Sequence, residues 1–247
     1  MKLHNNTILI TGGSSGIGLE LAKVLVANNN KILICGRNLD KLKQVKAELP
    51  EIEFLQCDIS KTEDCFKLAK WVNDNFPMCN ILINNAAIVH FSNFYESENI
   101  INEARLEMET NLLAPIVLCK LFLPIVEKNK FAQIINITTG LVYSPKADYP
   151  FYNATKAALH SFTQVLRKQL YGKSIKISEV MFPAVDTPWH KGNLPKIAIS
   201  TQLAVNKMLK ELEKDKDEIR VAGAKILYVV SRIAPKFAFK KINSLEK

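Results

Sequence analysis

Hydrophobic positions along the chain form short β-branched runs that alternate with longer segments of helical periodicity. The runs are nearly continuous in apolar residues, which is typical of strands buried on both faces of a parallel sheet. We predict six such strands, at Thr7–Thr11, Lys31–Cys35, Ile52–Gln56, Ile81–Asn84, Gln133–Ile137 and Lys176–Met181. Helices are predicted between them, at Gly16–Asn28, Leu39–Glu48, Lys61–Asn75, Asn99–Glu127 and Phe151–Tyr171. The alternation indicates an α/β fold with a doubly wound parallel sheet and helices on both faces.

The pattern loosens after the sixth strand. The segment Phe182–Ala198 contains three prolines and a glycine, which indicates a long excursion over the edge of the sheet. A charged helix at Thr201–Asp217 and a short strand at Glu218–Val221 follow, so the sheet should have about seven strands. The amphipathic segment Ala222–Phe239 comes last. No repeat or linker divides the 247 residues, and we expect a single domain.

Composition is that of an ordinary globular protein, with 48% apolar and 23% charged residues. The five cysteines are odd in number and never spaced as C-x-x-C, so we expect reduced, buried thiols. The residues before the first strand hold no apolar run long enough for a secretory signal. These features favour a cytoplasmic protein.

The formal net charge of +9 raises the question of nucleic-acid binding. The cations are 28 lysines and only five arginines, and they are spread along the chain beside acidic residues. A specific nucleic-acid surface would gather cations on one face and favour arginine, so we expect no such partner. The four histidines share no metal-ligand spacing, and we expect no metal site.

Glycines are scarce but clustered at the start of the chain. Four of the nine lie within seven residues, in the run from Thr11 to Gly18 that follows the first strand and opens the first helix. Phosphate binding at such a place needs backbone N–H groups at a helix N-terminus and no side chains in the way. We therefore predict a nucleotide phosphate site made of Gly12, Ser14, Ser15, Gly16, Ile17 and Gly18.

The end of the second strand indicates which dinucleotide is bound. An acidic residue there would bind the 2′-hydroxyl of NAD, but this chain has Gly36-Arg37. The planar guanidinium of Arg37 suits a 2′-phosphate. NADP is therefore the expected cofactor, and NAD the less favoured one.

Tyr152 and Lys156 are four residues apart on one predicted helix, which places both side chains on the same face. An ammonium beside a phenol favours the phenolate and lowers the pKa of the tyrosine. The pair follows strand ends that carry Asn84-Asn85 and Thr138-Thr139. The carboxyl ends of parallel strands meet at one edge of the sheet, where ligands bind, so these groups should converge.

These motifs resemble those of the short-chain dehydrogenase/reductase family. The family's T-G-x-x-x-G-x-G is similar to Thr11–Gly18, its N-N-A-G to Asn84–Ala87, and its Y-x-x-x-K to the Tyr152 and Lys156 pair. The stretches INITTG, YNATKAA and PAVDTP look most like the DltE-like branch. The resemblance implies a Rossmann fold whose residues 5–188 form the cofactor-binding and catalytic core, with a substrate lid and C-terminal amphipathic segment in 189–247.

The resemblance also implies a role for each matching residue. Tyr152 would be the general acid and base, Lys156 would bind the nicotinamide ribose, and Asn111 would hold a water for a proton relay. Thr139 takes the place of the family's catalytic serine. The remaining implied cofactor contacts are Asp58 to the adenine, Asn85 and Ala86 to the adenosine ribose, and Val185 and Thr187 to the carboxamide.

The resemblance implies an NADP-dependent oxidoreductase acting on a small carbonyl compound or secondary alcohol. The alternative is a catalytically weak NADP-binding regulatory protein on the same fold. By analogy with the family we expect a homodimer or homotetramer. From Ile219 to Lys241 there are six cations and no acids. We expect this tail to cover the body or a partner subunit, with contact to a membrane surface as the less favoured alternative.

Overall fold

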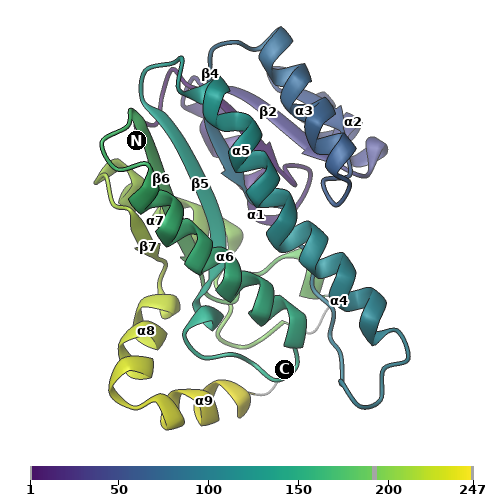
Figure 1. Cartoon of the computed structure of the whole chain (residues 1–247), viewed down its shortest axis with the longest axis vertical. Helices are drawn as coiled ribbons and strands as arrows, with labels where there is room; N and C mark the ends of the chain where they lie inside the picture. Colours follow the sequence, from purple (N-terminus) through teal and green to yellow (C-terminus); the bar gives the residue numbers. More distant parts are fainter. Residues whose placement is uncertain (1, 191–193, 246–247) are drawn as a thin grey trace.

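The computed structural model describes residues 2–190 and 194–245 and contains a seven-stranded sheet (Figure 1). The strand order is β3-β2-β1-β4-β5-β6-β7, and every neighbouring pair is parallel. The strands are β1 (Thr7–Thr11), β2 (Lys31–Gly36), β3 (Glu53–Gln56), β4 (Cys79–Asn84), β5 (Ala132–Thr139), β6 (Ile175–Phe182) and β7 (Glu218–Arg220). The sheet confirms the predicted doubly wound Rossmann architecture, and the order reverses between β1 and β4.

Helices cover both faces of the sheet because successive strand residues point to opposite sides. On one face, Ile8 and Ile10 pack with α1 (Gly16–Ala27), α2 (Leu39–Glu48) and α7 (Thr201–Glu213). On the other face, Leu9 packs with α3 (Thr62–Asn75), α5 (Ala114–Val126) and α6 (Pro150–Gln169). The two apolar layers explain why the strands lack polar alternation. Helix α7 ends four residues earlier than predicted, because Asp215 adopts a left-handed turn (φ 59°) that leads into β7.

The helix predicted at Asn99–Glu127 is continuous but not uniform. It consists of α4 (Ile100–Met108), a π-helical turn (Glu109–Leu113) and α5. Its length and apolar composition would allow it to cross a membrane, yet half of its most apolar stretch is buried inside the fold. We therefore assign it to the folded core. The π-helical turn contains Asn111, and such turns occur often at functional sites.

All five cysteines are free and buried, as the sequence predicts. Burial raises the pKa of the Cys65, Cys79 and Cys119 thiols to about 12. Cys57 lies beside Cys35, and its pKa is also raised. At neutral pH these side chains are protonated thiols that serve as small apolar groups in the core.

The predicted amphipathic segment Ala222–Phe239 is helical and is divided into two helices. The chain forms α8 (Gly223–Ile233) and α9 (Pro235–Asn243), because Pro235 cannot continue a helix and begins a new one. The apolar face expected to cover the body is exposed at Ile226, Val229, Ile233 and Phe237. The contact with the body uses Ala224 and Tyr228 instead. This apolar face therefore does not cover the body of its own chain, and coverage by a partner subunit stays a prediction.

Candidate active site

The glycine-rich turn between β1 and α1 leaves no room for side chains. Gly12 has a positive φ of 66°, a conformation that favours glycine. A Cβ atom at Gly18 would overlap the carbonyl oxygen of Gly12 and lie 2.6 Å from Nδ2 of Asn85. The turn therefore brings the bare N-terminus of α1 to the edge of the sheet at the point where the strand order reverses. This is the arrangement that a pyrophosphate needs.

Hydrogen bonds of Thr11 connect the end of β1 to the segment that follows β4. Its Oγ1 accepts hydrogen bonds from the backbone N–H groups of Asn85 and Ala86, both at 3.0 Å. The Asn85 amide donates from Nδ2 to the Thr11 carbonyl at 2.9 Å. The amide of Asn85, expected to contact a ribose, thus also holds the phosphate-binding turn against β4.

Ser14 lies against Gly36 at the end of β2, and Arg37 is the next residue along the chain. Ser14 Oγ lies 3.3 Å from the point where a Cβ of Gly36 would be. Arg37 is exposed, and within the described residues its guanidinium has no hydrogen-bond or ion-pair partner. Asp58 Oδ1 accepts from the N–H and the hydroxyl of Ser60, at 3.2 and 2.8 Å. The Arg37 guanidinium is therefore available to a ligand near the glycine-rich turn. The Asp58 carboxylate, in contrast, already stabilises the turn at Ser60.

The segment after β6 packs against the opposite side of the same turn. The Thr187 methyl group lies 3.3 Å from the point where a Cβ of Gly16 would be. Backbone hydrogen bonds from Asp186 N–H to the Ile199 carbonyl (2.8 Å) and from Ile199 N–H to the Ala184 carbonyl (3.1 Å) fix this segment. Thr187 therefore lies next to Gly16, while contact of Val185 and Thr187 with the carboxamide stays a prediction. Residues 191–193 of the predicted lid lie outside the described residues.

Thr139 and Tyr152 meet at the end of β5. The Thr139 hydroxyl donates to the Phe182 carbonyl at 3.3 Å, accepts from the Leu141 N–H at 3.3 Å, and lies close enough to the Tyr152 phenol to influence its pKa. Pro150 begins α6 and so fixes where Tyr152 faces the strand end. Burial raises the pKa of Tyr152, and the nearby Thr139 hydroxyl opposes this only in part. The phenol is neutral at physiological pH and can donate a proton.

Lys156 is 2% exposed, and its Nζ donates to the Ile137 carbonyl at 2.8 Å. Nζ lies 5.9 Å from the centre of the Tyr152 ring. Burial lowers the pKa of Lys156 to about 8, although the carboxylates of Glu179 and Glu107 act in the opposite direction. Burial dominates both groups, so the pKa of Tyr152 is raised overall, and the expectation that Lys156 lowers it stays a prediction.

Asn111 is fully buried and holds the segment after β4. Its Oδ1 accepts from the Ile88 N–H at 2.9 Å, and its Nδ2 donates to the Ile88 carbonyl at 2.8 Å. Asn111 Nδ2 also lies 3.4 Å from Thr155 Oγ1 on α6. The π-helical turn therefore places Asn111 between the β4 end and the Tyr152 helix.

Glu107 is a residue of this site that the sequence did not indicate. It is fully buried one helical turn before Asn111, and its Oε1 accepts from the backbone N–H and Nδ1 of His90 at 2.6 and 2.9 Å. Burial raises the pKa of Glu107, while the contacts with His90 oppose this. Hydrophobic periodicity identifies buried apolar residues, so a single buried glutamate in a helix looks like a surface residue in the sequence.

Aromatic side chains surround the mouth of this site. The rings of Phe91, Tyr149 and Trp189 form a chain of edge-to-face contacts with centroids 5.9 Å apart, and Trp189 stacks on His190 at 4.1 Å. Tyr149 lies close enough to influence the pKa of Tyr152. Trp189 and Phe91 are more than two-fifths exposed. The mouth therefore offers an apolar aromatic rim to a substrate.

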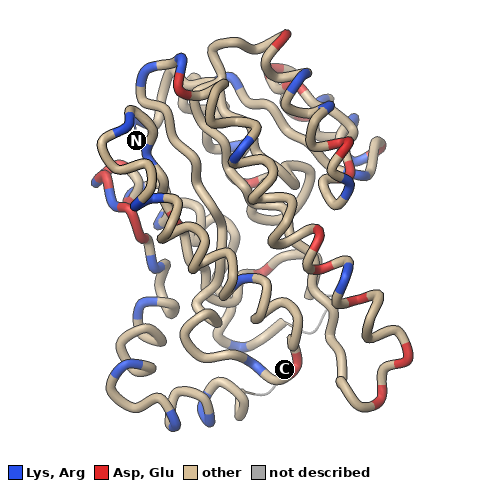
Figure 2. The backbone as a smooth tube through the Cα atoms, in the orientation of Figure 1, with Lys and Arg blue, Asp and Glu red and all other residues tan. Residues whose placement is uncertain are grey.

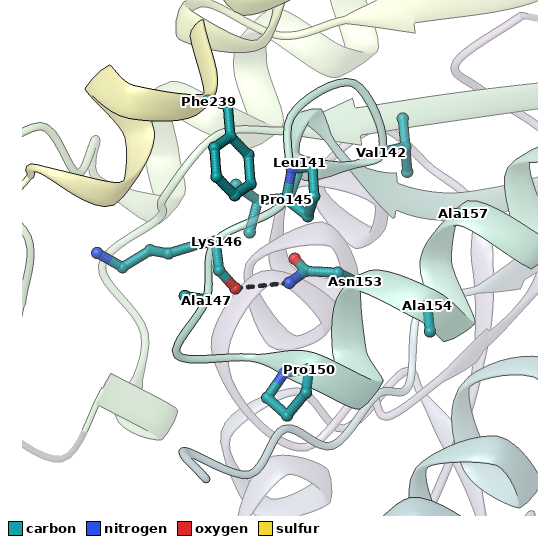
Figure 3. Close-up of a pocket in the computed structure, with 10 residues that line it drawn as sticks. All are labelled: Leu141, Val142, Pro145, Lys146, Ala147, Pro150, Asn153, Ala154, Ala157 and Phe239. Atoms are coloured by element: carbon teal, nitrogen blue, oxygen red, sulfur yellow. Dashed lines mark hydrogen bonds between the residues drawn. The ribbon is translucent and has the colours of Figure 1, made fainter. Parts of the chain in front are cut away.

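A separate cavity of about 450 Å³ lies on the outer side of the start of α6 (Figure 3). Its lining is mostly apolar and includes Leu141, Val142, Pro150, Ala157 and Phe239. In Figure 3 the Asn153 amide donates to the Lys146 carbonyl, a hydrogen bond of 2.6 Å. This cavity separates α9 from the body and does not contain the Thr139 and Tyr152 hydroxyls.

The fold and these groups define a dinucleotide-binding oxidoreductase. A glycine-rich turn suited to a pyrophosphate lies where the strand order of the sheet reverses. The hydroxyls of Thr139 and Tyr152 lie near the buried Lys156. The sequence profile of short chain dehydrogenases matches residues 6–197. The chain belongs to the short-chain dehydrogenase/reductase family, whose members are NAD(P)-dependent oxidoreductases.

Among its relatives, the uncharacterized oxidoreductase DltE of Bacillus subtilis is 39% identical over 251 residues, with both chains covered in full. A fatty acyl-CoA reductase of Acinetobacter baylyi is 30% identical over 76% of this chain and 65% of its own. A short chain dehydrogenase from Burkholderia cenocepacia in complex with NADP superposes with a TM-score of 0.87 at 23% identity, covering 98% and 99% of the two chains. One from Burkholderia phymatum in complex with NAD gives 0.83 at 17% identity, covering 100% and 98%. The chain is therefore similar in fold to complexes of either dinucleotide.

Proposed function

We propose that this chain is an NADP-dependent oxidoreductase that transfers hydride between nicotinamide and a carbonyl or secondary alcohol, with Tyr152 as general acid and base. The observation that carries the proposal is the proximity of the Thr139 hydroxyl to the buried Tyr152 phenol at the end of β5, one helical turn from the buried Lys156. Two neutral hydroxyls that face one point can hold a carbonyl oxygen and protonate it. When bound, the reduced nicotinamide supplies the hydride to the carbonyl carbon.

Each of the chain's own groups then has a defined task. Thr139 orients the carbonyl oxygen, and Tyr152 delivers its proton to that oxygen as the alkoxide develops. Lys156 would hold the nicotinamide ribose, and its charge would assist the phenol when the proton leaves. Asn111 would hold a water that feeds a proton relay through Lys156.

The exposed Arg37 guanidinium favours NADP in this proposal. Ser14 lies against the neighbouring Gly36, and a charge-assisted pair between a guanidinium and a phosphate suits a 2′-phosphate. The aromatic rim favours an apolar carbonyl substrate, and the name of the Acinetobacter relative supports including acyl thioesters among those tested. We also propose a cytoplasmic location, on the cysteine pattern and the first residues of the sequence, and a homodimer or homotetramer, on the family resemblance.

The test is a screen that follows NADPH absorbance over aldehydes, ketones, ketoesters and acyl thioesters. With an accepted substrate, Tyr152→Phe should lower turnover by about 10²–10⁴, because the general acid is lost, while NADPH affinity stays nearly unchanged. Wild-type-like turnover in this variant would refute the mechanism. A protein that binds NADPH tightly but turns over none of these classes would favour the regulatory alternative.

A further inference from the structure

Helices α8 and α9 form a bent arm that is attached to the body at its two ends (Figure 1). At the start of α8, Ala224 packs on Gly140, where an added Cβ would lie 3.0 Å from the Ala224 methyl. At the end of α9, the Asn243 amide accepts from the Ala147 N–H at 2.7 Å and donates to the Pro145 carbonyl at 3.1 Å. Between these attachments the cavity shown in Figure 3 keeps Phe239 apart from α6.

The face of the arm that points away from the body is apolar. Ile233 is 80% exposed, Ile226 is 68% exposed and Phe237 is 60% exposed. Val229 is about half exposed and extends the same surface, whereas Phe239 lines the cavity on the side of the body. Single exposed apolar residues are common on proteins, but four on two adjacent short helices form a patch that needs a partner.

The polar residues of the arm carry one sign of charge. Five exposed cations accompany the apolar face, namely Lys225, Arg232, Lys236, Lys240 and Lys241. No acidic residue lies between Ile219 and Lys241, and Figure 2 shows only Lys and Arg along α8 and α9. Within the described residues, no ion pair neutralises any of these five cations.

We propose that the α8–α9 arm docks on an anionic lipid surface, with its apolar side chains inserted at the headgroup boundary and its cations among the headgroups. A short helix with large apolar residues on one side and lysine or arginine beside them suits this location. A surface of anionic lipid attracts each nearby cation, and the attraction is strongest within about 10 Å at 0.1 M salt.

A second copy of the chain fits the same surface less well. A twofold contact through the arm would bring its five cations against the same five of the other copy, on a protein that already carries a net charge of +9. Like charges at an interface oppose association. The charge pattern therefore favours lipid over self-association.

The docked arm would lie against the active-site end of the molecule. Gly140 directly follows Thr139, and residues 145–147 lie on the connection from Thr139 to Tyr152. Both attachments of the arm are thus on the segment that joins the two proposed catalytic hydroxyls. This inference does not rest on the proposed function, since docking requires neither cofactor nor turnover.

The experiment is flotation of the full chain with vesicles of phosphatidylcholine containing about 30% phosphatidylglycerol, in about 0.15 M salt. We expect binding at least about tenfold stronger than to pure phosphatidylcholine vesicles, and weaker at high salt. Ile233→Ser with Phe237→Ser should abolish binding. Arg232→Gln with Lys236→Gln and Lys240→Gln should remove the preference for anionic vesicles.

Matched controls come from the far edge of the sheet. Phe66→Ser on α3 removes an equally exposed aromatic ring, and Lys41→Gln with Lys43→Gln on α2 removes exposed cations. Both should bind vesicles like the wild type. No wild-type binding, or equal loss in the controls, would overturn the proposal. So would loss of a dimer in analytical ultracentrifugation of the Ile233→Ser, Phe237→Ser protein without any vesicle binding by the wild type, because the face would then be an interface between copies.

Discussion

The ammonium of Lys156 lies 5.9 Å from the centre of the Tyr152 ring and is held by the carbonyl of Ile137 in β5. The strand, and not the phenol, thus fixes the lysine. Burial raises the pKa of Tyr152 and lowers that of Lys156, so both groups are biased towards their neutral forms. Burial therefore keeps the proton on the Tyr152 phenol and also makes the charged form of Lys156 unfavourable, because the ammonium is poorly solvated.

Lys156→Met should stabilise the protein while removing activity. The pKa of Lys156 falls from 10.5 to about 8 in the folded state, so its charge destabilises the fold fully below pH 8. This cost decreases as pH rises from 8 towards 10.5 and is absent above. At pH 7 the variant should gain up to about 3 kcal/mol, less the lost hydrogen bond to Ile137. Urea unfolding of both proteins at pH 7 and pH 10 measures this, and a gain that grows with pH would contradict it.

Arg37→Ala should weaken NADPH binding and leave NADH binding nearly unchanged. A charge-assisted bond to a phosphate contributes about 1.5–3 kcal/mol, which corresponds to roughly 10- to 150-fold in affinity. Calorimetric titration of both cofactors measures the difference. Arg105→Ala, an exposed arginine on α4, should have no effect. Equal affinities of the wild type for NADPH and NADH would remove the basis for the NADP assignment.

Thr139→Ser should keep most of the activity, and Thr139→Val should lose most of it. Serine retains the hydroxyl that contacts Tyr152, whereas valine keeps the shape and removes that hydroxyl. Without it, turnover should fall by about 10²-fold, as for the loss of one oriented donor at a developing oxyanion. Steady-state kinetics on a substrate found in the screen gives the answer. If valine turns over as fast as threonine, another group holds the carbonyl.

Glu107→Ala should lower both stability and kcat/KM, because it leaves the buried N–H of His90 without an acceptor. An unsatisfied buried donor costs about 1–3 kcal/mol. Glu107→Gln retains an acceptor oxygen and should restore most of the thermal stability and activity. This rescue separates positioning of the His90 segment from a requirement for negative charge. Failure of glutamine to restore activity while restoring stability would assign the carboxylate charge a direct role.

The sheet could be predicted from the sequence because strands buried on both faces are nearly continuous runs of apolar residues. The glycine turn and the Tyr152 and Lys156 pair were also predictable, since their spacing is local. The role of Glu107 was not, because its burial depends on how the π-helical turn faces β4 and α6. The contact of α8 with the body was not predictable either, for a related reason. Periodicity identifies an apolar face but not whether the body lies against it, and here the small Ala224 makes the contact.

The burial of every cysteine makes this protein a natural background for site-specific labelling. Each native thiol is at most 2% exposed, and burial disfavours the reactive thiolate. A single introduced cysteine, such as Ile233→Cys on the arm, should therefore be the site that maleimide reagents modify in the folded protein. An environment-sensitive fluorophore at that position would report directly on whether the arm enters an apolar phase, without any prior removal of the native cysteines.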